Sequence, residues 1–141
     1  MKIVVSACLL GENCKYNGGN NYSETVAKFV EGKEVISVCP ECLAGLGVPR
    51  VPIEIVNGEV RRQDGASVDK ALRLAIEQIL SQLEGQDIAC AILKSRSPTC
   101  GVKQVYDGTF SGKLVDGMGV LAAALQEKGY KVIDSEDCRC K

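Results

Sequence analysis

Short apolar runs alternate along the chain with longer segments in which apolar residues recur at helical spacing. The apolar runs are rich in β-branched residues, as is typical of buried strands, and they cover 3–8, 34–39, 88–93 and 130–133. Helical spacing of apolar residues extends over 68–83 and 120–125. Gly85 and Gly129 follow these two segments and predict where the helices end. Ser23 predicts the start of a further short helix because its side chain can cap the first turn.

This alternation predicts an α/β fold with a parallel sheet of about four strands flanked by helices. The dipeptide Asn57-Gly58 stands between two short β-branched segments and indicates a small β-hairpin insertion. Asp107-Gly108 indicates another hairpin by the same argument. The chain contains no internal repeat and no low-complexity linker, so residues 1–141 are expected to form a single domain.

The overall composition indicates a soluble protein. Hydrophobic residues make up 45% of the chain, yet no apolar run approaches the roughly 18–20 residues of a membrane-spanning helix. The first apolar stretch breaks at Gly11 and Glu12, so it is interpreted as a buried strand and not as a signal peptide. Seventeen basic and eighteen acidic residues give a net charge of −1, which offers no basic face for nucleic acid. We expect a cytoplasmic protein that binds neither membranes nor nucleic-acid polymers.

The chain has eight cysteines and no histidine. Without imidazole, neither a Ser-His-Asp triad nor a Cys-His pair can form, so acid–base chemistry must come from carboxylates, lysines, tyrosines or thiols. Disulfide-rich scaffolds are typically shorter and secreted, whereas this chain is long enough to bury its own core. Cys90 lies inside an apolar run and is predicted to be a core residue. The other cysteines indicate metal binding or thiol chemistry.

Three cysteines follow three of the predicted strands. Cys8, Cys39 and Cys100 each stand at or just after a strand end. Ligands of parallel sheets bind beyond the carboxyl ends of the strands, so these thiols are expected to converge there. Three thiolates without imidazole suit a soft metal centre such as an iron–sulfur cluster. On a four-iron cube, three protein ligands would leave one iron open as a Lewis acid.

The remaining cysteines keep other kinds of site open. Cys39 and Cys42 form a CxxC pair, which is compatible with a thioredoxin-like redox site or with half of a four-cysteine zinc site. Cys138 and Cys140 would supply the other half of the zinc site. Otherwise these two residues are expected to lie in a poorly ordered and dispensable tail. Cys14 is interpreted as a spare thiol or a further ligand.

Three motifs occur in order along the chain, between residues 6 and 101. They are Ser6–Gly11 with Cys14–Tyr16, Cys39–Glu41 through Pro49–Arg50, and Leu93–Gly101. These segments resemble the motifs of the DUF523 family, which includes the thiouracil desulfidases. The resemblance implies a Rossmann-like domain that holds a [4Fe-4S] cluster through Cys8, Cys39 and Cys100. It also implies that Glu41 and Ser97 lie near the substrate.

The resemblance implies a non-redox desulfidase acting on a thiolated pyrimidine such as thiouracil, thiouridine or its monophosphate. Glu41 would activate water or relay protons, and Ser97 would orient the base or cap its loop. Lys94 and Arg96 would offset the charge of the cluster or contact a phosphate. Cys42 departs from the family pattern, as do the Ala44-Gly45 pair and the cysteines of the tail, which leaves the choice of substrate open.

Two functions of other classes also remain open. The chain would be an iron–sulfur accessory or sulfur-handling protein if it bound a cluster without catalysing a reaction. It would be a zinc-stabilised or thiol-redox module if it bound no cluster at all.

Overall fold

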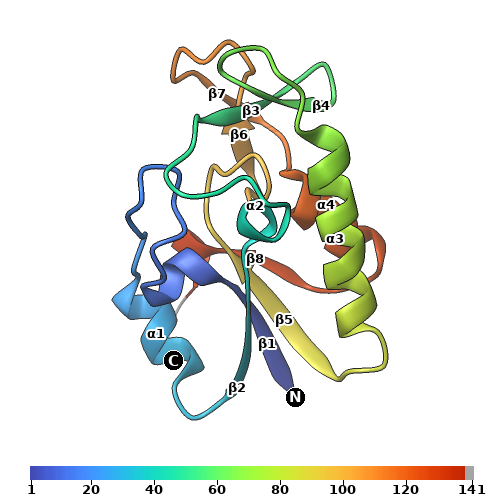
Figure 1. Ribbon diagram of the computed structural model, residues 1–141. Helices are drawn as coiled ribbons and strands as arrows, with labels where there is room; N and C mark the ends of the chain where they lie inside the picture. The colour runs from blue at the N-terminus through green and yellow to red at the C-terminus, as the bar shows by residue number, and fades with distance from the viewer. Residues whose placement is uncertain (139–141) are drawn as a thin grey trace.

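The computed structural model describes residues 1–138 and has a four-stranded parallel sheet at its centre (Figure 1). The strands lie in the order β2-β1-β5-β8, and each neighbouring pair is parallel. Their bounds are β1 Lys2–Ser6, β2 Glu34–Val38, β5 Ile88–Leu93 and β8 Val132–Asp134. The predicted α/β fold with a parallel sheet of about four strands is confirmed.

Helices cover both faces of this sheet. The helices and 3-10 turns of the described residues are η1 Ala7–Leu10, α1 Glu24–Val30, α2 Pro40–Leu43, α3 Asp69–Leu83, α4 Val120–Glu127 and η2 Ser135–Asp137. In Figure 1, α1 lies on one side of the sheet, and α3 and α4 lie on the other. The Ser23 side chain accepts a hydrogen bond from the backbone N–H of Val26 at 3.2 Å, as predicted for the cap of α1. Among residues 1–138, no helix has the length and apolar character needed to cross a membrane.

Alternate residues of the strands pack into two hydrophobic clusters. Val4 and Leu93 belong to the cluster that includes residues of α3 and α4. Val5 and Ile92 belong to the cluster that includes residues of α1. Cys90 lies in this second cluster with 6% of its surface exposed, so its predicted core role is confirmed. Because successive side chains of a strand point to opposite faces, the central strands of a sheet covered on both sides are nearly continuous apolar runs.

The chain after α4 differs from the sequence prediction at two points. The backbone N–H of Tyr130 bonds to the carbonyl of Leu125, so strand β8 begins only at Val132. Cys138 is 5% exposed and packs in the cluster beneath α1, because the η2 turn carries the chain back onto the sheet. The expectation of a poorly ordered tail is therefore wrong for Cys138, and Cys140 lies outside the described residues.

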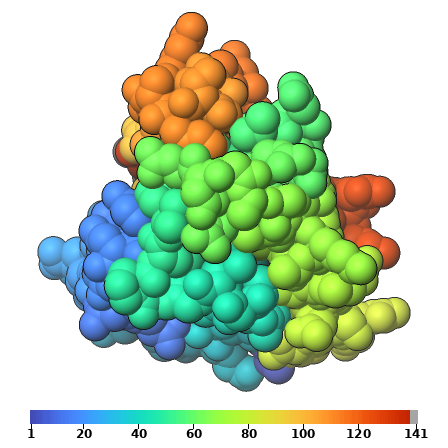
Figure 2. Space-filling model, turned by 45° about the horizontal axis from the view of Figure 1, so that its top comes forward, coloured from blue at the N-terminus to red at the C-terminus, as the bar shows by residue number. Residues whose placement is uncertain are grey.

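Two antiparallel hairpins stand beyond the carboxyl ends of the sheet strands (Figure 1). They are β3 Ile53–Val56 with β4 Glu59–Arg62, and β6 Gln104–Tyr106 with β7 Leu114–Asp116. Both hairpins agree with the sequence prediction. The buried carboxylate of Glu54 accepts hydrogen bonds from the backbone N–H groups of Gly108, at 2.9 Å, and Phe110, at 3.2 Å. These bonds join the two hairpins, which lie side by side in Figure 2 as its green and orange segments.

Candidate active site

The three cysteines predicted to bind a metal each follow a strand, but none lies on one. Strand β1 ends two residues earlier than predicted, and Cys8 lies in the 3-10 turn η1. Gly11 ends this turn in a left-handed conformation, with φ of 93°. Cys39 is the extended N-cap residue of α2, and Pro40 at the first helical position favours this helix start. Cys100 lies in the loop after β5.

All three cysteines line one cavity of about 460 Å³ at the carboxyl end of the sheet. Glu41 and Ser97, which are predicted to lie near the substrate, line the same cavity. The structure therefore brings together all five predicted site residues, which come from three segments that are widely separated in the sequence.

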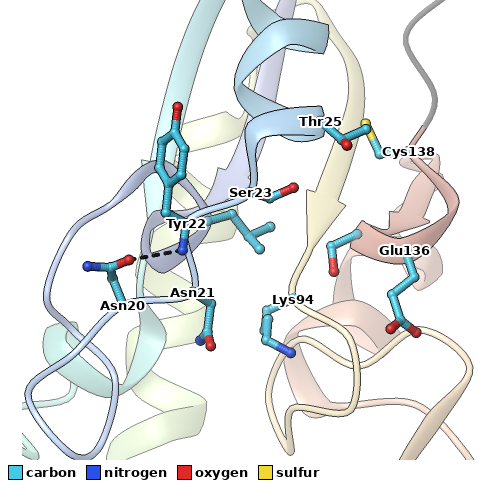
Figure 3. Close-up of a pocket in the computed structure, with 10 residues that line it drawn as sticks. Asn20, Asn21, Tyr22, Ser23, Thr25, Lys94, Glu136 and Cys138 are labelled. Carbon is cyan, nitrogen blue, oxygen red and sulfur yellow. Dashed lines mark hydrogen bonds between the residues drawn. The ribbon is translucent and has the colours of Figure 1, made fainter.

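A larger and more open depression, of about 1070 Å³, borders this cavity. Figure 3 shows Lys94 on its wall between Asn21 and Glu136. Lys94 and Asn21 line both spaces, whereas Cys138 is the only cysteine among residues 1–138 that lines the depression. Arg96 donates hydrogen bonds to both carboxylate oxygens of Glu136, at 2.9 and 3.0 Å. The smaller cavity is the better candidate for an active site because four thiols and the Glu41 carboxylate meet there; the thiols are those of Cys8, Cys14, Cys39 and Cys100.

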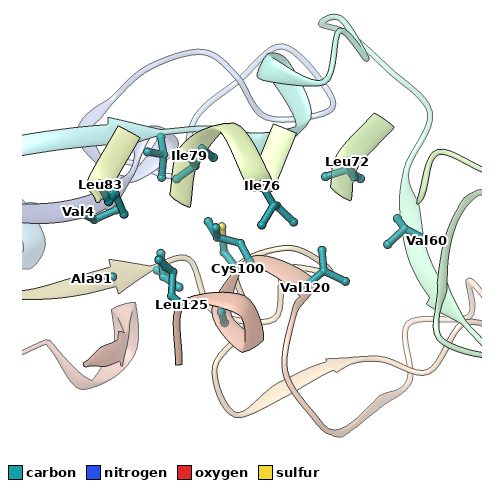
Figure 4. Close-up of a cluster of buried hydrophobic side chains, with 14 residues drawn as sticks. Val4, Val60, Leu72, Ile76, Ile79, Leu83, Ala91, Cys100, Val120 and Leu125 are labelled. Atoms are coloured by element: carbon teal, nitrogen blue, oxygen red, sulfur yellow. The ribbon is translucent and has the colours of Figure 1, made fainter. Parts of the chain in front are cut away.

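Burial raises the pKa of all three predicted ligands. Cys100 is 4% exposed within the core cluster drawn in Figure 4, and desolvation and the Glu41 charge raise its pKa to about 12. Desolvation is also the largest cause of the raised pKa of Cys8 and Cys39, and Glu41 acts in the same direction. A hydrogen bond from Asn21 to the Cys8 sulfur, at 3.4 Å, opposes this shift. Because metals bind thiolates, metal binding here must release protons and is expected to strengthen as the pH rises.

Both carboxylate oxygens of Glu41 have partners. Oε1 accepts a hydrogen bond from Thr99 Oγ1 at 2.8 Å. Oε2 lies 3.6 Å from Cys39 Sγ and 4.0 Å from Arg50 Nη2. The side chains of Glu41 and Arg50 are 12% and 9% exposed, so this ion pair is shielded from most of the solvent. The carboxylate is thus held in one orientation beside a predicted metal ligand.

Ser97 organises the loop that carries Cys100. Its Oγ accepts hydrogen bonds from the backbone N–H groups of Thr99 and Cys100, both at 3.1 Å. Ser97 Oγ also lies 2.9 Å from Thr99 Oγ1. Because Thr99 donates its hydroxyl hydrogen to Glu41, Ser97 is the donor in that pair. Of the two roles predicted for Ser97, this geometry supports the capping of the loop.

The same loop leaves no room for a side chain at Gly119. A Cβ there would overlap the carbonyl carbon of Thr99 and would lie 2.6 Å from its oxygen and 2.7 Å from the backbone nitrogen of Cys100. We expect Gly119→Ala to displace the loop, to lower the free energy of unfolding in urea by about 1–3 kcal/mol, and to reduce iron uptake. Gly117→Ala is the matched control, since its Cβ would make an ordinary contact of 3.4 Å with Val105. Equal stability of the two variants would contradict this close approach.

A second set of cysteines is more compact than the predicted ligand set. The Sγ atoms of Cys14, Cys39 and Cys42 all lie within 4.8 Å of one another. Burial, partly opposed by a hydrogen bond with Cys39, raises the pKa of Cys14 to about 11. Cys42 is exposed, and its Sγ lies 3.9 Å from the carbonyl oxygen of Cys14. Cys138 does not join this group, so it does not complete a four-cysteine zinc site with the CxxC pair.

Three residues that shape the site were not singled out as candidates from the sequence. Thr99 is fully buried and holds Glu41, and Arg50 lies beside the same carboxylate. Glu54 lines the cavity while it fixes the second hairpin. Thr99 stands next to Cys100 inside the third motif, and Arg50 ends the second motif, so membership of a motif was the signal in the sequence for both residues. Glu54 offered none, because an acidic residue in a hairpin is ordinarily exposed.

The chemistry of the donor set fits a [4Fe-4S] cluster. Cys8, Cys39 and Cys100 offer three soft sulfur ligands in a chain that has no imidazole to compete with them. A cube of four irons carries its ligands on separate corners. This arrangement suits the three thiols spread around the cavity better than the compact group of Cys14, Cys39 and Cys42.

Comparisons with known proteins agree with this arrangement. A family model described as 2-thiouracil desulfurase matches residues 3–137. The uncharacterized protein YbbK of Bacillus subtilis (strain 168) is 37% identical in an alignment of 145 positions that covers 96% of each chain. The solved structure of TudS (DUF523Vcz), a [4Fe-4S]-dependent thiouracil desulfidase, matches with a TM-score of 0.88 and 33% identity over 96% of this chain and 91% of that chain. The resemblance carried by the three motifs is confirmed, and the chain belongs to the 2-thiouracil desulfurase (DUF523) family.

Proposed function

We propose that this chain is a desulfidase that removes the sulfur atom of a thiolated pyrimidine with the help of a [4Fe-4S] cluster. The observation that carries the proposal is the convergence of Cys8, Cys39, Cys100 and Glu41 on one cavity. Family membership and the likeness to a [4Fe-4S]-dependent thiouracil desulfidase support it. The reaction converts C=S to C=O, consumes one water and releases hydrogen sulfide, so it requires no net electron transfer.

In this proposal, Cys8, Cys39 and Cys100 would hold the cluster through their thiolates. When bound, the cluster supplies a Lewis-acidic iron that attracts the soft sulfur of a thiocarbonyl. Three thiolates place a large negative charge in a poorly solvated cavity. Lys94 offsets part of it, since this lysine lines the cavity and interacts electrostatically with Cys8. Arg50 does the same beside Glu41.

Glu41 is the proposed acid–base group. Its carboxylate takes a proton from the attacking water and returns it to the departing sulfur. Thr99 fixes Oε1, and Oε2 lies beside Cys39, so the carboxylate borders the place where the reaction would occur. Thr99 and Ser97 are positioning residues in this scheme, because they act on substrate only through Glu41 and the Cys100 loop.

The cavity suits a small planar base. Tyr16, Tyr106 and Ile53 contribute aromatic and apolar walls against which a pyrimidine ring can pack. A volume of about 460 Å³ lies within the range usual for small-molecule sites, roughly 300–1,000 Å³. These features support thiouracil, thiouridine or its monophosphate as the substrate, with Lys94 available for a phosphate.

The test is sulfide release by protein reconstituted anaerobically with iron and sulfide. We expect about four irons per chain, a broad visible absorbance, and sulfide release from 2-thiouracil or 4-thiouridine monophosphate. A cluster-loaded protein that desulfurises neither compound would instead be an iron–sulfur accessory protein. Protein that assembles no cluster would be a zinc or thiol-redox module.

The contact between Thr99 and Glu41 gives a narrower test. Thr99→Val keeps the shape of the side chain but removes the hydrogen bond to a charged group, which is worth about 1.5–3 kcal/mol. We expect kcat for sulfide release to fall by roughly 10–100-fold, with KM and iron content unchanged. Thr99→Ser retains the hydroxyl and should recover most of the activity. Loss of iron in Thr99→Val would show that the residue supports the cluster loop and not Glu41.

A further inference from the structure

Cys39 belongs to two sets of thiols that differ in their spacing. We propose that Cys14, Cys39 and Cys42 form a second site, overlapping the first at Cys39, for a single soft cation such as Zn²⁺. We further propose that this ion and the [4Fe-4S] cluster exclude each other, because both require Cys39. The exclusion rests on the proposed function, whereas the ion site does not.

The spacing of the compact set matches a mononuclear ion. Tetrahedral zinc with Zn–S bonds of about 2.3 Å places its sulfur ligands about 3.8 Å apart. The sulfurs of Cys14, Cys39 and Cys42 already lie within 4.8 Å of one another, so small rotations of the side chains bring them to bonding distance. Cys8 and Cys100 lie outside this group, and a cluster needs that wider spread.

The backbone places these three thiols together without strain on any of them. Cys39 is the N-cap residue of α2, and Cys42 lies three residues later on the same short helix. Residues three apart on a helix are neighbours, which is why a CxxC pair offers two ligands to one ion. Cys14 comes from the loop after η1, and this loop is tied down where Arg50 donates a hydrogen bond to the Cys14 carbonyl at 2.9 Å.

The charge and exposure of the site also suit a metal ion from solution. Three thiolates around a divalent cation leave one net negative charge, and the Arg50 guanidinium beside Cys14 balances the Glu41 carboxylate that lies next to Cys39. Cys42 is exposed, while Cys14 and Cys39 are half-buried, so an ion can enter from the solvent side. A water molecule can fill the fourth position, as it does in zinc sites with three protein ligands. An exposed cysteine beside two other thiols is not explained by packing in the core.

The experiment uses reduced, iron-free full-length protein under anaerobic conditions, with Co²⁺ as a spectroscopic probe. Wild-type protein is expected to bind one Co²⁺ per chain, with thiolate charge-transfer bands and tetrahedral d–d bands, and Zn²⁺ should displace it. Cys42→Ser should weaken binding by more than about 100-fold, because loss of an outer-shell partner already costs 10–100-fold. Cys8→Ser is the matched control and should bind Co²⁺ as tightly as wild type.

The exclusion is tested by reconstituting the cluster in zinc-loaded protein. Zinc-loaded wild type should assemble much less cluster than iron-free protein, whereas Cys42→Ser treated with the same zinc should assemble it normally. Normal assembly in zinc-loaded wild type would overturn the exclusion. Reduced wild type that binds no Co²⁺, Cys42→Ser that binds it normally, or Cys8→Ser that loses it would each overturn the ion site. Failure of every variant to assemble a cluster would instead overturn the proposed function, while the Co²⁺ results would still decide the ion site.

Discussion

Replacing Cys100 with serine is expected to abolish both iron binding and sulfide release. A hydroxyl is a hard donor with a very high pKa, so it cannot take the place of a thiolate on a soft iron centre. Cys100 is 4% exposed, which leaves little access for a water molecule to act as a substitute ligand. The measurements are iron and acid-labile sulfide per chain after anaerobic reconstitution, the visible absorbance, and sulfide release from 2-thiouracil.

Cys90→Ala is the matched control for this variant. Like Cys100, Cys90 is a buried cysteine, but it lies on strand β5 itself, packs in the cluster beneath α1 and does not line the cavity. We expect it to keep its iron and its activity, with a modest loss of stability from the smaller side chain. Wild-type iron content in a folded Cys100→Ser protein would show that Cys100 is not a ligand.

Replacing Glu41 with glutamine is expected to leave the cluster in place and to remove most of the activity. The amide has nearly the size of the carboxylate, and its oxygen can still accept the hydrogen bond from Thr99. It cannot take a proton from water at neutral pH, so turnover should fall by roughly 10²–10⁴-fold, the usual contribution of a positioned acid–base group. Iron content and sulfide release are measured on the same preparation.

Glu136→Gln serves as the control for Glu41→Gln. Glu136 is half-exposed and pairs with Arg96 at the surface, so its change to an amide should leave turnover near the wild-type value. Near-normal turnover by a cluster-loaded Glu41→Gln protein would remove Glu41 from the mechanism. Loss of iron in that protein would show that the carboxylate is needed to build the cluster site, since its Oε2 lies only 3.6 Å from Cys39 Sγ.

Several features of this protein were determined by the sequence alone. The helical spacing of apolar residues over 68–83 predicted α3 to within a residue, because its buried stripe depends only on the local period of the helix. Asn57-Gly58 predicted the first hairpin for the same local reason, since the dipeptide favours the turn itself. The absence of histidine and the three motifs were sufficient to predict the family and the kind of cofactor to expect.

The tertiary structure alone decided which side chains meet. Strand order brings β1, β2 and β5 side by side, so the loops that carry Cys8, Cys39 and Cys100 border one cavity. The hydrogen bond between Thr99 and Glu41 spans 58 residues, and no local pattern reports a contact at that separation.

Tertiary packing also decided that Cys138 is buried and that Cys14 lies beside Cys39 and Cys42. Cys138 follows a polar segment, yet the chain turns back at η2 and buries it beneath α1. Cys14 meets Cys39 and Cys42 only because the loop after η1 lies against the start of α2. Periodicity and turn signals are short-range properties of the backbone, whereas the sets of thiols that can share one metal depend on how distant loops pack together.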